Sequence, residues 1–101
     1  MFEQAYRYRF ADRVDLREAG DTLLLAVLAA DGLFGAARVR MDAAFATDES
    51  INVIIVDAST DVGQAVSGVF TAFLTREFGC RAFSVIRVDG IAGNSRQEEG
   101  R

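Results

Sequence analysis

The sequence predicts a small α+β domain, a two-layer sandwich in which helices cover one face of an antiparallel sheet. Three observations support this prediction. Several short segments alternate apolar and polar residues with the period of a strand, and two longer segments repeat apolar residues at helical spacing. The length of 101 residues fits a single domain, and a domain of this size buries roughly two-thirds of its unfolded surface.

The first strand is expected at 4–11, "QAYRYRFA". Tyr6, Tyr8 and Phe10 occupy one face and Arg7 and Arg9 the other, a period of two that is typical of a half-buried strand.

A helix follows, which Asp12 or Asp15 can cap and which is expected to end at Asp31 and Gly32. Its predicted apolar face consists of Leu16, Ala19, Leu23, Val27 and Ala30, widened by Leu24, Leu25 and Leu28. The widened face suggests a helix that is buried on more than one side.

The segment 35–46, "GAARVRMDAAFA", also alternates and is predicted as the second strand. One face of that strand would carry Val39, Met41, Ala43 and Phe45, and the other Arg38, Arg40 and Asp42. The cluster "TDES" at 47–50 is expected to form a turn.

The third strand is expected at 51–58, "INVIIVDA", which is apolar on both faces as in a central strand. A second helix should run from Ser59 or Thr60 to Phe78, with Gly79 at its C-terminal end. The segment 81–88, "RAFSVIRV", is the fourth predicted strand.

The resulting order, β-α-β-β-α-β, is that of the ferredoxin-like two-layer sandwich: a four-stranded antiparallel sheet with two helices on one face. We expect one such domain over 1–89 and a flexible polar tail over 90–101. This likeness is to a fold and names no function, because the architecture hosts enzymes, RNA binders, metal carriers and regulatory dimers.

Composition excludes several kinds of chemistry. The chain has no histidine, so histidine-based acid–base catalysis and histidine metal sites are impossible. All basic residues are arginine, which rules out a P-loop lysine, and Cys80, the single cysteine, cannot form an internal disulfide. A net charge of −4 argues against a broad nucleic-acid surface. No cofactor is expected, no apolar run approaches the ~20 residues that span a bilayer, and the location is expected to be cytoplasmic.

The candidate ligand-binding residues fall into two groups. The first comprises the arginines expected on the open face of the sheet, Arg7, Arg9, Arg38 and Arg40, joined by Arg87 if Phe83 and Val85 face outward. Such a face could bind an anion. It is more readily explained as a surface that pairs with a second copy or another protein, because apolar residues of the central strand share it.

The second group is the strand-to-helix corner "VDASTD", with Asp57, Ser59, Thr60 and Asp61. Asp57-x-Ser59-x-Asp61 resembles, over five residues, the metal-ion motif of von Willebrand A-type domains, in which an acidic strand end and hydroxyls bind a divalent cation. Here Asp61 stands where that motif has serine, and the chain is too short for that doubly wound fold. Two carboxylates and two hydroxyls could hold Mg²⁺, and a helix N-terminus can hold an anion.

The structural explanation of the corner is simpler: Ser59 or Thr60 caps the helix, Asp61 complements the helix dipole and Asp57 pairs with an arginine, Arg9 being the expected partner. The sequence therefore predicts a non-catalytic binding or assembly module, a homodimer or a domain that docks on a protein partner through its sheet face or edge. The alternative is a regulatory or catalytic domain for an anionic ligand or a metal, built on the corner and nearby arginines.

Overall fold

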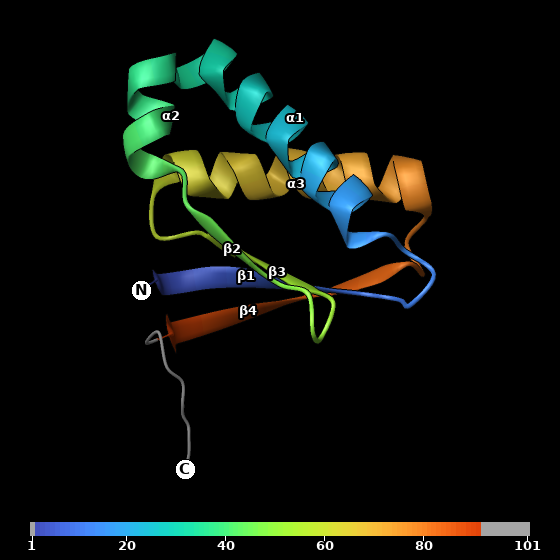
Figure 1. Cartoon of the computed structure of the whole chain (residues 1–101). Helices are drawn as coiled ribbons and strands as arrows, with labels where there is room; N and C mark the ends of the chain where they lie inside the picture. The colour runs from blue at the N-terminus through green and yellow to red at the C-terminus, as the bar shows by residue number, and fades with distance from the viewer. Residues whose placement is uncertain (1, 92–101) are drawn as a thin grey trace.

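A computed structural model describes residues 2–91 (Figure 1). The elements, in chain order, are β1 (Phe2–Phe10), α1 (Leu16–Phe34), α2 (Ala36–Asp42), β2 (Phe45–Asp48), β3 (Val53–Asp57), α3 (Asp61–Phe78) and β4 (Phe83–Ile91). β4 thus includes positions 90 and 91 of the predicted tail, and the remainder of that tail, 92–101, lies outside the described residues.

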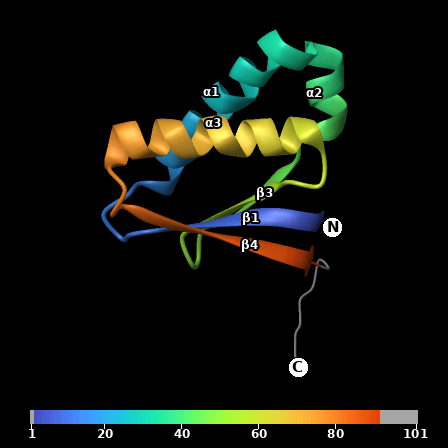
Figure 2. The same cartoon turned by 180° about the vertical axis from the view of Figure 1, so that it is seen from behind.

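The strands form one sheet in the order β2-β3-β1-β4, with every neighbouring pair antiparallel. Both long helices lie on the same side of this sheet, seen from opposite directions in Figures 1 and 2. The predicted α+β class and four-stranded antiparallel sheet are therefore confirmed, but the described chain has three helices where two were expected. None of the helices within residues 2–91 has the length and apolar character needed to cross a bilayer.

The core lies between the sheet and the two long helices, and Tyr8 of β1 is at its centre. Its ring is fully buried and lies 4.7 Å, centroid to centroid, from the ring of Phe70 on α3. On the same side of β1, the ring centroid of Phe10 lies 6.2 Å from that of Phe83 on β4. Because side chains alternate along a strand, the inward position of Tyr8 sends Arg7 and Arg9 to the opposite, open face.

The prediction of a strand over 35–46 is wrong, because Ala36–Asp42 form the helix α2. Alanine, arginine and methionine all favour helix, and this local preference prevails over the alternating pattern. Val39 is the buried residue of this helix, whereas Met41 is 84% exposed. The second strand is shorter than expected and begins only at Phe45. Arg38 and Arg40 consequently do not lie on the sheet.

α1 also differs from the prediction, since it passes through Gly32 and ends at Phe34. Gly35, with a φ of 88°, separates it from α2 and adopts the left-handed backbone that glycine tolerates best. The expected broad burial of α1 is wrong as well, since Leu24, Leu25 and Leu28 are exposed. One face of the helix is buried, and its buried side chains are those of Ala19, Thr22, Leu23, Ala26 and Ala30.

Gly63 allows α3 to start directly against the end of β3. A Cβ at this position would collide with the carbonyl oxygen of Asp57 and would come within 3.2 Å of Thr60 Oγ1. By contrast, Gly68 has open space where its Cβ would be. Close packing therefore requires glycine at position 63 and does not require it at position 68.

We expect the substitution Gly63→Ala to lower the free energy of unfolding by about 1–3 kcal/mol, because the methyl group displaces the helix from the strand end. The matched change Gly68→Ala should raise it by roughly 0.5–1 kcal/mol, because alanine is the better helix former. Urea titration of both variants measures the effect. Equal changes in the two variants would contradict the close packing of Gly63.

Candidate functional site

The strand-to-helix corner is held by hydrogen bonds within the chain. Oδ1 of Asp57 accepts from the backbone N–H and the hydroxyl of Ser59, at 3.0 and 2.6 Å. Oγ1 of Thr60 accepts from the N–H of Gly63 at 2.9 Å and donates to the carbonyl of Asp42 at 3.2 Å. Thr60 is thus the N-cap of α3, and Ser59 partners the carboxylate that ends β3.

Arg38 joins this corner from α2. Its Nη2 lies 2.7 and 2.8 Å from the two carboxylate oxygens of Asp61. Its Nε lies 3.6 Å from Asp42, and its guanidinium lies 5.1 Å from the ring centroid of Phe34. The side chains of Arg38 and Asp61 are both largely exposed, so this ion pair contributes little to stability. The ion pair nevertheless links α2 to the first turn of α3.

Arg7 and Arg9 lie on the open face of the sheet, apart from that corner. Arg9 is opposite Val53 of β3, whereas Asp57 is opposite Ala5. Four positions of strand, or about 13 Å, separate Arg9 from the level of Asp57. The expected ion pair between Arg9 and Asp57 is not formed, because the carboxylate bonds to Ser59 instead.

The candidate ligand-binding residues therefore do not form one site. Asp57, Ser59, Thr60 and Arg38 meet at the corner, while Arg40 is exposed elsewhere on α2. Across residues 2–91, no three side chains of the metal-binding types Asp, Glu, Cys or His come together closely enough to hold a metal ion.

The open face combines the two arginines with apolar residues. Arg7 lies between Ile55 of β3 and Ile86 of β4, its neighbours across the two ladders. Ile86 is 50% exposed. Arg87 does not join this face: it is opposite Tyr6, and its Nε lies 3.6 Å from Asp89. Because Phe83 and Val85 pack against the core, the alternation of β4 turns Arg87 to the helix side.

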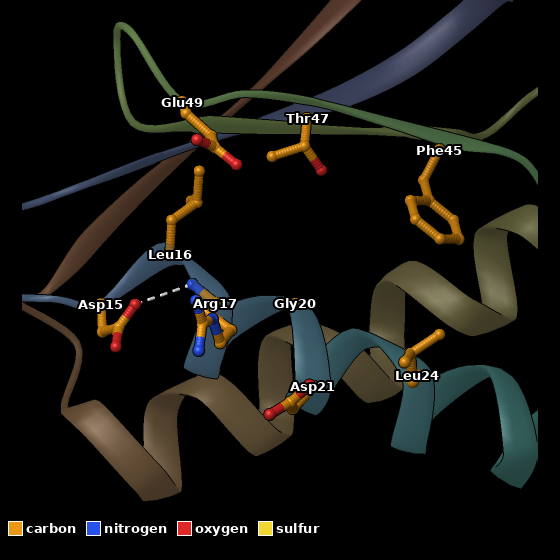
Figure 3. Close-up of a pocket in the computed structure, with 9 residues that line it drawn as sticks. All are labelled: Asp15, Leu16, Arg17, Gly20, Asp21, Leu24, Phe45, Thr47 and Glu49. Carbon is orange, nitrogen blue, oxygen red and sulfur yellow. Dashed lines mark hydrogen bonds between the residues drawn. The ribbon is translucent and has the colours of Figure 1, made fainter.

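A groove of about 480 Å³ lies between the first half of α1 and β2 (Figure 3). Phe45, Thr47 and Glu49 project from β2 and its turn toward Leu16 and Leu24 of α1. The remaining lining residues are Asp15, Arg17, Gly20 and Asp21. The groove is apolar in the middle and charged at its rim. Sequence reasoning missed it because it treated Leu24 as part of the core, although this residue falls outside the helical spacing of the buried face.

A second groove, of about 320 Å³, lies on the other side of α3, next to β4. Tyr8 closes its floor: the hydroxyl donates to the carbonyl of Ser67 at 3.0 Å and lies 2.8 Å from Oγ1 of Thr71. Among the residues that the structure describes, Oγ of Ser67 has no hydrogen-bond partner, and it is buried from solvent. Burial raises the pKa of Tyr8 above its ordinary value, partly offset by the hydrogen bonds with Thr71 and Ser67.

Comparisons with protein-family models, with curated proteins and with solved structures found no match to this chain.

At the corner, we expect Thr60→Ala to lower the free energy of unfolding by about 1 kcal/mol, because it removes the N-cap of α3. Thr75→Ala, the same change on an exposed side of the same helix, should have no comparable cost, because Thr75 bonds only to a carbonyl of its own helix. Thermal unfolding of both variants tests this. Similar losses in the two would mean that the cap does not hold the corner.

Tyr8 predicts an alkaline loss of stability. The unfolded chain ionises this phenol near pH 10, whereas the folded chain holds the proton to higher pH. Stability is therefore complete below pH 10 and falls as the pH rises above it. Tyr8→Phe should flatten the profile above pH 10, because it removes the ionisable group. Urea titrations at pH 8 to 11 measure the slopes, and an unchanged slope in Tyr8→Phe would contradict the burial of the ionisable group.

Proposed function

We propose that this chain is a ferredoxin-like domain that acts by binding, as a self-associating assembly module rather than a stand-alone enzyme. The fold is supported by the strand order β2-β3-β1-β4 and by the position of α1 and α3 on one face of the sheet. In this view α2 is an addition to the connection between β1 and β2. The single cysteine, which leaves no internal disulfide, supports a cytoplasmic location.

The observation that carries the proposal is the amount of large apolar surface left open. The exposed side chains are those of Leu24, Leu25, Leu28, Leu33, Met41, Phe45, Ile51 and Ile86. Of these, Leu24 and Phe45 share one groove. A monomeric domain seldom leaves a contiguous apolar patch uncovered, and a second copy is the commonest cover. The alternative of a ligand site at the corner has less support, because Ser59, Thr60 and Asp61 already have partners in the fold.

The proposal predicts a homodimer in solution. Sedimentation velocity over a wide range of protein concentration should show a species of twice the chain mass of 11.0 kDa that dissociates on dilution. Its formation should weaken little with added salt if apolar contact drives it. A species of single-chain mass at the highest attainable concentration would refute self-association as the function.

A further inference from the structure

Within residues 2–91, the outer edge of β2 has backbone groups with no strand partner. In this antiparallel pair, the N–H of Asp57 donates to the carbonyl of Ala44 at 2.9 Å, and the register continues with Ala46 opposite Ile55. Since hydrogen-bonded and non-hydrogen-bonded pairs alternate along such a ladder, Ala46 also points its backbone groups toward β3. The N–H and C=O of Phe45 and Thr47 then point outward, away from the sheet.

The two edges of the sheet are protected differently. The outward-facing residues of β4 are Phe83 and Val85, whose side chains pack against the core, and then Arg87 and Asp89. These last two form an exposed charged pair of the kind that discourages pairing with another strand.

The outward-facing residues of β2, Phe45 and Thr47, have no charge, and the neighbouring Ala46 is small. The charged residue of β2, Asp48, ends the strand, and its carboxylate accepts hydrogen bonds from Ser50 in the following turn. β2 is consequently the edge open to a further strand.

Apolar side chains of α1 flank this same edge. Leu24 shares the groove of Figure 3 with Phe45 and is 51% exposed. Leu28 follows one helical turn later on the same side of α1 and is 62% exposed. The free edge and the apolar row are thus parts of one surface, which we call the β2–α1 surface: Phe45, Ala46, Thr47, Leu24 and Leu28.

We propose that a second copy of this chain docks on the β2–α1 surface, its β2 antiparallel to the first, so that the two sheets join into one. The twofold axis passes at Ala46, which faces the partner's Ala46. Phe45 then pairs with the partner's Thr47, and Thr47 with the partner's Phe45, so that all the outward backbone groups of both strands are used. This inference rests on the proposed self-association and names the surface that performs it.

A second copy fits this surface better than an isolated peptide does. β2 has only four residues, so strand pairing gives few ladder hydrogen bonds whichever chain supplies the added strand, and an isolated peptide would have little else to bind with. A second copy brings its own α1 above the joined strands, where its Leu24 and Leu28 cover the same row on the first copy. A twofold interface pairs the same surface of both copies, and here that pairing brings the apolar residues of one copy against those of the other.

Paired lysine substitutions separate this surface from the open sheet face. We expect the variant Thr47→Lys with Leu28→Lys to weaken the dimer at least about 100-fold, because the twofold axis brings like charges together in an apolar contact. The matched control is Ser84→Lys with Ile86→Lys, which makes the same kinds of change on the open face of β4 and should leave the dimer unchanged. Sedimentation velocity measures both, and circular dichroism checks that each variant is folded.

Each outcome has a definite meaning. If the open-face variant dissociates and the β2–α1 variant does not, the inference is overturned while self-association stands. If neither variant dissociates, the inference is likewise overturned. If the wild-type chain is monomeric, the proposed function fails and this inference fails with it. If an extended peptide of another protein occupied the surface instead, the wild-type chain would be monomeric alone.

A disulfide cross-link tests the register without weakening the interface. Across a non-hydrogen-bonded antiparallel pair the Cα atoms are about 4.5 Å apart, within the range that a disulfide spans. In a Cys80→Ser background, which removes the exposed native thiol, Ala46→Cys should oxidise to a covalent dimer. Ser84→Cys in the same background should not. Failure of Ala46→Cys to cross-link in a chain that sediments as a dimer would overturn the proposed pairing.

Discussion

The structure depends on the inward position of Tyr8. Its ring is buried against Phe70, and its hydroxyl bonds to Ser67 and Thr71, so β1 and α3 are held at one distance and in one register. A phenol buried in this way must keep its hydrogen bonds, and a strand that slipped by one residue would turn it to solvent. Because β1 pairs with both β3 and β4, its orientation decides which side chains of those strands face the helices.

The surface that remains open follows from that arrangement. With the aromatic residues of β1 facing the helices, Arg7 and Arg9 must share the opposite face with Ile55 and Ile86. The order of strands then places β2 and β4 at the edges, with β1 and β3 paired on both sides. Among the residues whose backbone groups point outward, β4 has the charged Arg87 and Asp89 whereas β2 has none, and the β2 edge lies beside exposed leucines of α1. This asymmetry distinguishes the β2–α1 surface from the other exposed apolar residues.

The corner after β3 illustrates how a motif can resemble a binding site and still serve the fold. Asp57, Ser59 and Thr60 are polar residues at the end of a buried strand, which is also where ligand sites are found. In the structure each of them has a partner within the chain, and α3 approaches so closely that only glycine fits at position 63. Arg38 reaches Asp61 from a helix that the sequence pattern did not reveal. A helix cap and an ion pair account for the polar groups that the sequence singled out.

The sequence by itself determined the elements whose patterns agree with their local preferences: β1 with its alternating aromatics, the buried β3, and α3 between Thr60 and Gly79. It also determined that Thr60 or its neighbour caps α3, because capping is a local interaction. It could not decide the segment 36–42, where an alternating pattern competes with residues that favour helix, and the resulting error displaced Arg38 and Arg40 from the sheet. Nor could it decide whether Leu24 and Leu28 are buried, since helical spacing shows which residues share a face but not what covers that face. Register, edges and exposure arise from contacts between residues far apart in the chain, and for that reason only the tertiary structure decided them.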